Sequence, residues 1–207
     1  YQHVTKPEVR ERFERAWQLA PGTLDDKVGL TVVEVMHAIK HGDIRGMYVQ
    51  GENPAMSDPD ANHARESLAA LEHLVVQDIF LTETAYLADV ILPAGAVPEK
   101  TGSFTNTDRL VQMGRQAIDP PGDARQDWKI IQDIAKAIGR EKGFTFTEPR
   151  EIFNELRIAS KGGVADYSGI SWEKVERQQG VFWPCPSEDH PGTPRLFEPG
   201  SWNVVAR

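Results

Sequence analysis

The sequence contains a single cysteine, Cys185, among its 207 residues. One cysteine excludes an internal disulfide framework and any metal cluster that cysteines of this chain alone would hold. The chain also lacks an excess of basic residues, because 23 Lys and Arg stand against 31 Asp and Glu, for a net charge of −8. An acidic chain of this kind is not expected to bind nucleic acid or an anionic membrane surface.

No uncharged run approaches the roughly 18 residues that a membrane span needs, so we expect no direct membrane insertion. The sequence begins at Tyr1, without Met and without the pattern of a signal peptide. We therefore expect an internal segment of a longer, cytoplasmic protein. A chain of 207 residues is long enough for one or two domains whose core needs no disulfide or metal.

Residues 1–42 predict a helical lead-in of two helices. Residues 5–8 have the pattern of a capping box with Pro in the first turn, which predicts the start of the first helix. Residues 31–34 form a second capping-box pattern, and Gly42 is a typical residue to follow the end of that helix.

Residues 43–140 predict an α/β region. Three short apolar runs, typical of buried strands, lie at residues 46–50, 74–76 and 89–92. Asp58 is expected to cap a helix between the first two runs, and Thr82 to open a short helix before the third. Strands that alternate with helices at this spacing predict parallel pairing with right-handed crossovers. The predicted fold class is α/β: a short, Rossmann-like parallel sheet flanked by helices, with a helical and irregular C-terminal part.

The rest of the chain gives weaker signals. Residues 102–106 and 110–112 are compatible with short strands or with extended loop, and a longer helix is expected over residues 122–138. Residues 141–207 predict a helical segment that begins near Pro149, followed by a Pro-rich tail. Such a tail is expected to pack on a neighbouring domain or to link to it.

Polar residues follow each of the three predicted strands, where ligands of open parallel sheets bind. Residues 50–54 follow the first strand, Gln77 and Asp78 the second, and Glu99 and Lys100 the third. A carboxylate at such an edge suits the hydroxyls of a ribose, and a lysine suits a phosphate. The alternative is that these residues are polar only because strand ends meet solvent, since neither a glycine-rich dinucleotide fingerprint nor a Walker loop is present.

Two other groups of residues are candidates for a metal site or a reactive thiol. His37 and His41 lie one helical turn apart with Glu34 on the same side, which fits either a metal site or an exposed helix face. Cys185 fits either a reactive thiol or a packed small residue, and no positive charge neighbours it in the sequence. No nucleophile elbow is present, so the sequence predicts no catalytic residue and no metal ligand.

Five stretches are specific enough to compare with a known family: Tyr48–Pro54, Leu74–Ala85, Ala88–Ala94, Glu99–Arg109 and Pro120–Trp128. They resemble the large subunit of molybdopterin-dependent oxidoreductases, and most closely the alpha subunit of formate dehydrogenases. Residues 183–186 and 189–194 favour formate dehydrogenases over nitrate reductases within this resemblance.

The resemblance implies a molybdenum or tungsten ion held by two molybdopterin guanine dinucleotides beside a [4Fe–4S] cluster. The family's contacts to the guanine dinucleotide match five positions of this sequence: Asn53, Gln77, Asp78, Lys100 and Asp127. Which of them contacts ribose and which contacts guanine stays open.

The resemblance further implies that the whole protein oxidises formate to carbon dioxide. The family's catalytic residues and cluster cysteines have no counterpart here, so the chain alone is expected to be inactive and to hold no cofactor. Expected partners are the remaining domains of the same subunit and iron–sulfur or NAD-linked electron-transfer subunits. The alternatives are a non-catalytic nucleotide-binding or subunit-docking module, and an oxidoreductase of the same family with another substrate, such as nitrate.

Overall fold

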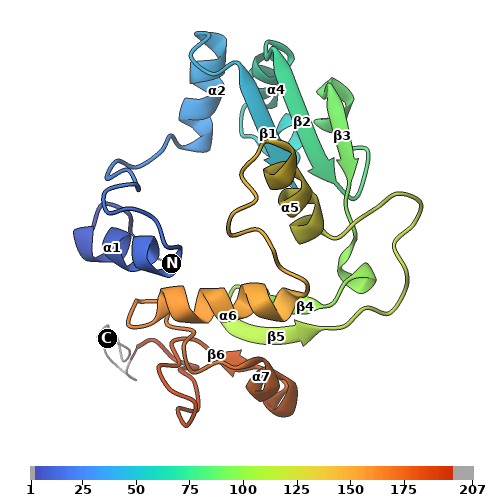
Figure 1. Cartoon of the computed structure of the whole chain (residues 1–207). Helices are drawn as coiled ribbons and strands as arrows, with labels where there is room; N and C mark the ends of the chain where they lie inside the picture. Colours follow the sequence, from blue (N-terminus) through green and yellow to red (C-terminus); the bar gives the residue numbers. More distant parts are fainter. Residues whose placement is uncertain (1–2, 198–207) are drawn as a thin grey trace. The chain divides into compact units, whose positions relative to one another are not determined.

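The computed structural model describes residues 3–197, and the chain divides into two compact units (Figure 1). Unit 1 consists of residues 1–28, 101–117 and 135–207, and unit 2 of residues 29–100 and 118–134. Both units are therefore discontinuous in sequence. The domain boundaries expected at residues 42/43 and 140/141 stay predictions.

Unit 2 is built on a three-stranded sheet in the order β1-β2-β3. Its strands are β1 (Gly46–Gln50), β2 (His73–Asp78) and β3 (Val90–Pro93), and both pairings are parallel. In the register, Gln50 lies opposite Gln77, and Asp78 opposite Pro93. The parallel α/β fold predicted from the three apolar runs is confirmed.

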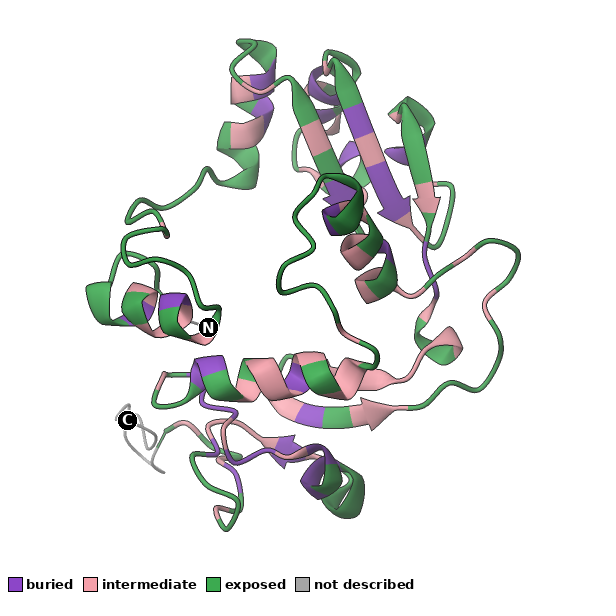
Figure 2. Cartoon of the chain, in the orientation of Figure 1, coloured by how far each residue is buried: buried purple, intermediate pink, exposed green. Residues whose placement is uncertain are grey.

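Helices cover one face of this sheet with an apolar layer (Figure 2). α2 (Val32–Lys40) contributes Met36 and Ile39, and α4 (Ala61–Ala69) contributes Ala64 and Leu68. They pack with the core side chains of the strands, Val49, Leu74 and Val76. Because a buried Leu or Val stabilises a fold by roughly 1.5–3 kcal/mol, this layer holds the sheet and both helices together.

Shorter elements and one longer helix complete unit 2. These are α3 (Pro54–Ser57), the 3₁₀ turns η1 (Ala85–Leu87) and η2 (Val97–Glu99), and the beginning of α5 (Asp127–Ala137). The short helix expected to open at Thr82 begins three residues later, as the η1 turn with Thr84 at its N-cap, although the Thr82 hydroxyl accepts a hydrogen bond from the Ala85 amide at 3.2 Å. The helix expected from Gly122 begins five residues later, because Gly122 has φ +52°, outside the right-handed helical region, and Arg125 forms a parallel bridge with Ala94.

One of the three predicted helix caps is confirmed. The Thr31 hydroxyl accepts from the Glu34 amide, and the Glu34 carboxylate accepts from the Thr31 amide at 2.7 Å. The box at residues 5–8 is wrong: Lys6 is the N-cap, so Thr5 lies one residue too early to cap α1 (Pro7–Ala16).

The cap predicted at Asp58 is also wrong. Asp58 ends α3, and α4 therefore starts after Asp60, whose side chain accepts from the His63 amide at 3.1 Å. Asp58 and Asp60 are both of the residue type that helix N-caps favour. Because Asp58 already ends α3, Asp60 takes the N-cap position of α4.

Unit 1 combines helices with an antiparallel sheet of order β4-β5-β6. Its elements are α1, β4 (Gly102–Thr105), β5 (Leu110–Gly114), α6 (Pro149–Ser160), α7 (Trp172–Gln178) and β6 (Val181–Phe182). The two segments for which strand and loop stayed open are therefore strands. A core of Val111, Phe153 and Tyr167, among others, joins the sheet to the helices.

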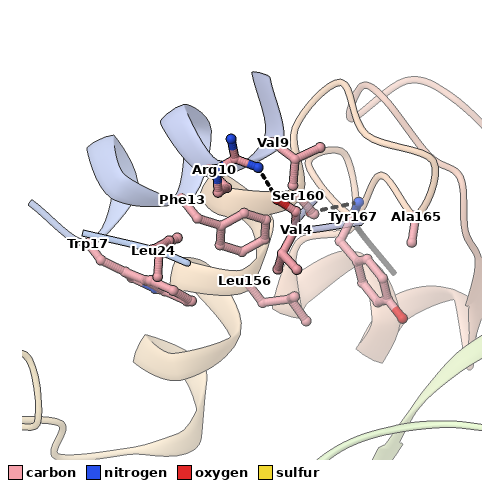
Figure 3. A pocket seen from close by; sticks show the side chains of 10 residues that line it. All are labelled: Val4, Val9, Arg10, Phe13, Trp17, Leu24, Leu156, Ser160, Ala165 and Tyr167. Atoms are coloured by element: carbon pink, nitrogen blue, oxygen red, sulfur yellow. Dashed lines mark hydrogen bonds between the residues drawn. The ribbon is translucent and has the colours of Figure 1, made fainter. Parts of the chain in front are cut away.

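An apolar pocket of about 350 Å³ lies in unit 1. Figure 3 shows that Phe13 and Trp17 from α1 and Leu156 from α6 line it, together with Tyr167. A hydrogen bond of 3.0 Å from the Trp17 indole to Glu155 ties α1 to α6 beside this pocket. Phe13 and Trp17 therefore lie on the side of α1 that packs against α6.

The Pro-rich segment of unit 1 is held by one buried cation. The Lys174 ammonium, 1% exposed, donates to the carbonyls of His190 at 2.6 Å, Glu188 at 2.7 Å and Gly169 at 3.3 Å. It also lies 3.4 Å from Sγ of Cys185, which is itself fully buried. Cys185 is thus a packed residue, and although no positive charge neighbours it in the sequence, α7 brings Lys174 to it across the fold.

Candidate functional site

Four side chains form a connected cluster at the carboxyl end of the parallel sheet in unit 2. We call Tyr48, Gln77, Lys100 and Asp127 the Asp127 cluster. Nε2 of Gln77 donates to Oδ1 of Asp127 at 2.8 Å, and Nζ of Lys100 contacts Oδ2 of the same carboxylate at 2.5 Å. The Tyr48 hydroxyl donates to Oε1 of Gln77. Three of the five predicted site residues therefore meet directly.

Local structure explains why these residues converge. Gln77 ends β2, and Lys100 follows the η2 turn after β3, so both lie at the carboxyl edge of the sheet. Asp127 is the first residue of α5, where a carboxylate is favoured by the unpaired amides of the helix start. Tyr48 and Gln77 are on the sheet face opposite the apolar layer, because they alternate with the core residues Val49 and Val76 along their strands.

The electrostatics of the cluster keep Asp127 ionised. Burial opposes its ionisation, but the hydrogen bonds from Lys100 and Gln77 outweigh burial and lower the pKa of Asp127 below its ordinary value. The Lys100 and Asp127 side chains are only 24% and 29% exposed, so solvent screens this ion pair less than a surface pair. The Asp127 carboxylate and the Lys100 ammonium are therefore held side by side in their charged forms.

A second cluster follows β1 and contains Asn53, Glu83 and Thr84. Oδ1 of Asn53 accepts from the Thr84 hydroxyl at 2.8 Å and from its amide at 3.2 Å, and Nδ2 donates to Glu83 at 2.7 Å. That bond from Asn53 is the main reason that the pKa of Glu83 is lowered. Asn53 thus ties the loop after β1 to the loop before η1.

The backbone joins the loop after β1 to the end of β2. The Gly51 amide donates to the Gln77 carbonyl at 2.9 Å, and Gly51 has φ +62°, which only glycine adopts without strain. A Cβ on Gly51 would meet no atom within 4 Å. Space is therefore open at this turn, where a ligand is able to approach the backbone.

Asp78 has a local role in the structure. Its Oδ1 accepts from the amides of Ile79 at 2.6 Å and Phe80 at 3.5 Å, in the loop that follows β2. Phe80 is 73% exposed, and its neighbours Ile79 and Leu81 are exposed as well. Among the hydrogen bonds of the described residues, none joins the Asp78 side chain to the other four predicted site residues. Asp78 therefore shapes the loop at the edge of the site.

Two participants were missed by reasoning from the sequence. Tyr48 lies within the first predicted strand, and Thr84 lies within the stretch Leu74–Ala85 that carries the family resemblance. A tyrosine inside a short buried strand is a signal that its hydroxyl needs a polar partner. A buried threonine next to an acidic residue is a weaker signal, because threonine is common in loops.

Of the two histidines His37 and His41, which the sequence offers as a metal site, His37 has a packing role. His37 stacks on His63 of α4 with ring centroids 4.8 Å apart, which packs α2 against α4. Over residues 3–197, no group of three or more His, Cys, Asp or Glu side chains is arranged to hold a metal ion. Over the same residues, no helix combines the length and hydrophobicity that a membrane span requires.

The sequence of this chain is similar to those of known proteins. Residues 9–137 match the family described as molybdopterin oxidoreductase. The chain is 43% identical over 197 residues to the assimilatory nitrate reductase catalytic subunit of Bacillus subtilis, covering 95% of this chain and 28% of that protein. It is 44% identical over 186 residues to the F420-dependent formate dehydrogenase subunit alpha of Methanocaldococcus jannaschii, covering 90% and 26%. The chain thus spans about a quarter of these relatives.

A solved structure supports the fold. Acetylene hydratase from Pelobacter acetylenicus superposes with a TM-score of 0.63 over 99% of this chain and 27% of its own length, at 20% sequence identity. The similarity extends across both units, and it concerns the fold alone. The nitrate reductase and the formate dehydrogenase match this chain about equally well, so these comparisons do not fix the substrate.

Proposed function

The chain belongs to the molybdopterin oxidoreductase family, and we propose that its unit 2 binds the guanosine-phosphate end of a molybdopterin guanine dinucleotide. The observation that carries this proposal is the Asp127 cluster, in which Gln77, Lys100 and Asp127 converge at the carboxyl end of a parallel sheet. Ligands of open α/β sheets bind at this edge.

The donor set fits a nucleotide. The Asp127 carboxylate retains lone pairs for the paired N–H donors of a guanine or the two hydroxyls of a ribose. The Lys100 ammonium suits a phosphate oxygen, and Asn53 adds an amide at the neighbouring loop. The open space at Gly51 leaves room for a ligand to reach the backbone. Asp78 contributes by holding the loop that borders this space.

The residues of this chain serve binding and orientation. The chemistry that the cofactor supplies when bound is electron transfer at its molybdenum or tungsten ion. Gln77 holds the Asp127 carboxylate in place from the buried side, and Lys100 offsets its charge, so the nucleotide end would be fixed at two points. Fixing that end orients the rest of the cofactor toward parts of the protein outside this chain.

For the whole protein we propose oxidation of formate to carbon dioxide. Relatives named as formate dehydrogenases support this substrate, including formate dehydrogenase H of Escherichia coli, at 36% identity over 96% of this chain. Reduction of nitrate is the second candidate, which the nitrate reductase of Bacillus subtilis favours at 43% identity. The full-length protein, assayed with formate and with nitrate, distinguishes the two candidates. The proposal for the whole protein includes iron–sulfur or NAD-linked electron-transfer partners, a [4Fe–4S] cluster and a cytoplasmic location.

Titration of the purified chain with GDP tests the proposed site, because GDP carries the guanosine and phosphates without the pterin. We expect saturable binding, and Lys100→Gln and Asp127→Asn should each weaken it by about 10- to 100-fold, since each removes a charged hydrogen-bond partner. Lys40→Gln and Asp133→Asn are matched controls, because both residues form ion pairs elsewhere in unit 2. Absence of GDP binding, or equal loss in the controls, would refute the proposal.

A further inference from the structure

The hydrogen bonds of the Asp127 cluster run in one direction across the sheet. The Tyr48 hydroxyl of β1 donates to Oε1 of Gln77 on β2, and Nε2 of Gln77 donates to Oδ1 of Asp127 at the start of α5. Three elements are thus connected through one amide. Tyr48 has no part in the function proposed above, and its hydroxyl is the end of the chain of hydrogen bonds that lies furthest from Lys100.

The order of donors follows from the charge of Asp127. An ionised carboxylate only accepts hydrogen bonds, so the amide of Gln77 must turn its NH₂ group toward Asp127. Its carbonyl oxygen then faces Tyr48, and the phenol must donate. If the amide were reversed, its oxygen would face the carboxylate, and two acceptors would meet at Asp127. The arrangement therefore has a single favourable state.

Burial raises the energetic cost of losing the hydrogen bond between Tyr48 and Gln77. Gln77 is 0% exposed, so an amide oxygen that lost its donor would have little access to water. Burial, and then the charge of Asp127, raise the pKa of Tyr48, which keeps the phenol protonated and able to donate. Tyr48 is itself 40% exposed, so its ring does not depend on deep packing.

We propose that Tyr48 is a positioning residue of the nucleotide site: its hydroxyl holds the Gln77 amide in the orientation that Asp127 requires, and this amide holds the Asp127 carboxylate where the ligand binds. The inference rests on the proposed function for the identity of the ligand. The positioning itself is a property of the ligand-free chain. The two statements can therefore fail separately.

The test is Tyr48→Phe, which keeps the ring and removes only the hydroxyl. Tyr86→Phe is the matched control, because Tyr86 is 74% exposed on η1 in the same unit. NMR follows the carboxyl carbon of Asp127 during an acid titration, and an amide spectrum verifies that each variant is folded. GDP titration follows binding in parallel.

In Tyr48→Phe, we expect the Asp127 titration midpoint to rise relative to wild type, because the Gln77 amide loses one of the two contacts that hold it against the carboxylate. GDP affinity should fall about three- to tenfold, as expected for one lost hydrogen bond. Tyr86→Phe should change neither quantity. A packing role alone would leave the midpoint unmoved, since phenylalanine preserves the ring.

An unchanged Asp127 midpoint in folded Tyr48→Phe would overturn the inference, whatever happens to GDP binding. A midpoint that rises in a chain whose wild type binds no GDP would support the positioning role and refute the proposed ligand. A midpoint that rises equally in Tyr86→Phe would also overturn the inference, because the effect would then be unspecific.

Discussion

Thr84 anchors the loop that carries Asn53, and Thr84→Val tests how much this anchor contributes. Its side chain is 0% exposed, and its hydroxyl donates to Oδ1 of Asn53 at 2.8 Å while accepting from the Ala55 amide at 3.1 Å. Valine is branched at Cβ like threonine, so the substitution removes both hydrogen bonds without opening a cavity.

The magnitude follows from what each partner loses. The bond to Asn53 contributes about 0.5–1.5 kcal/mol net, and Oδ1 keeps its second donor, the Thr84 amide at 3.2 Å. The Ala55 amide has no such substitute, and Ala55 is 0% exposed, so leaving its N–H unpaired costs about 1–3 kcal/mol. We expect Thr84→Val to lower the free energy of unfolding by about 2–4 kcal/mol.

Urea unfolding followed by circular dichroism measures this loss for the chain. Because the chain has two compact units, hydrogen exchange read peptide by peptide assigns the loss to unit 2. We expect faster exchange in residues 51–58 and 80–88, and unchanged exchange in the strands of unit 1. GDP binding should weaken as well, because the loop that carries Asn53 loses its anchor.

Thr23→Val is the control, since the Thr23 hydroxyl donates to the Ala20 carbonyl on the surface of unit 1. It should change stability by less than about 0.5 kcal/mol. If Thr84→Val is equally mild and exchange in both loops stays unchanged, the buried hydroxyl does not anchor the loop and the reasoning is refuted.

Three further predictions concern charge and burial. The pKa of Asp127 is lowered, so its contribution to stability should be complete above its ordinary value of 3.8 and lost as the pH falls through the lower folded pKa. Urea unfolding at a series of acid pH values measures this, and Asp127→Asn should flatten the dependence. Lys174→Met should cost about 3–5 kcal/mol in urea unfolding, because the carbonyls of Gly169, Glu188 and His190 lose their cationic donor. Burial raises the pKa of the Cys185 thiol against the opposing effect of Lys174, so native Cys185 should react with a thiol reagent far more slowly than in urea.

Each of these three predictions has an outcome that would contradict it. A pH dependence that Asp127→Asn leaves unchanged would mean that other carboxylates dominate the acid range. Lys174→Met within about 1 kcal/mol of wild type would mean that water replaces the ammonium at the carbonyls. Rapid labelling of Cys185 without denaturant would mean that the segment around it opens readily.

The parallel sheet was predictable because its information is local. Short apolar runs ended by Gly51, Asp78 and Pro93 describe strands, and helices between them leave parallel pairing as the usual solution. The capping box at Thr31 is equally local, because both of its hydrogen bonds lie within four residues. The cap at Asp60 was missed because Asp58 offers the same chemistry two residues earlier.

The site was predictable as a location but not as a set of contacts. Polar residues after each strand place Gln77 and Lys100 at one sheet edge, and resemblance adds Asp127. That Asp127 lies against both of them depends on how α5 returns to the sheet, 50 residues after Gln77. Sequence reasoning likewise grouped Asp78 with the others, whereas its carboxylate binds the amides of its own loop.

By itself, the sequence determined the three parallel strands, most of the helices, the sheet edge at which polar residues gather, and membership of a family through motifs spread over the chain. Those features depend on neighbours within a few residues. Only the tertiary structure decided that Tyr48 donates to Gln77, that Thr84 donates to Asn53, and that Lys174 lies beside Cys185. Such contacts join residues 11 to 31 positions apart, and they exist only once strand register and helix packing have brought the side chains within hydrogen-bond distance.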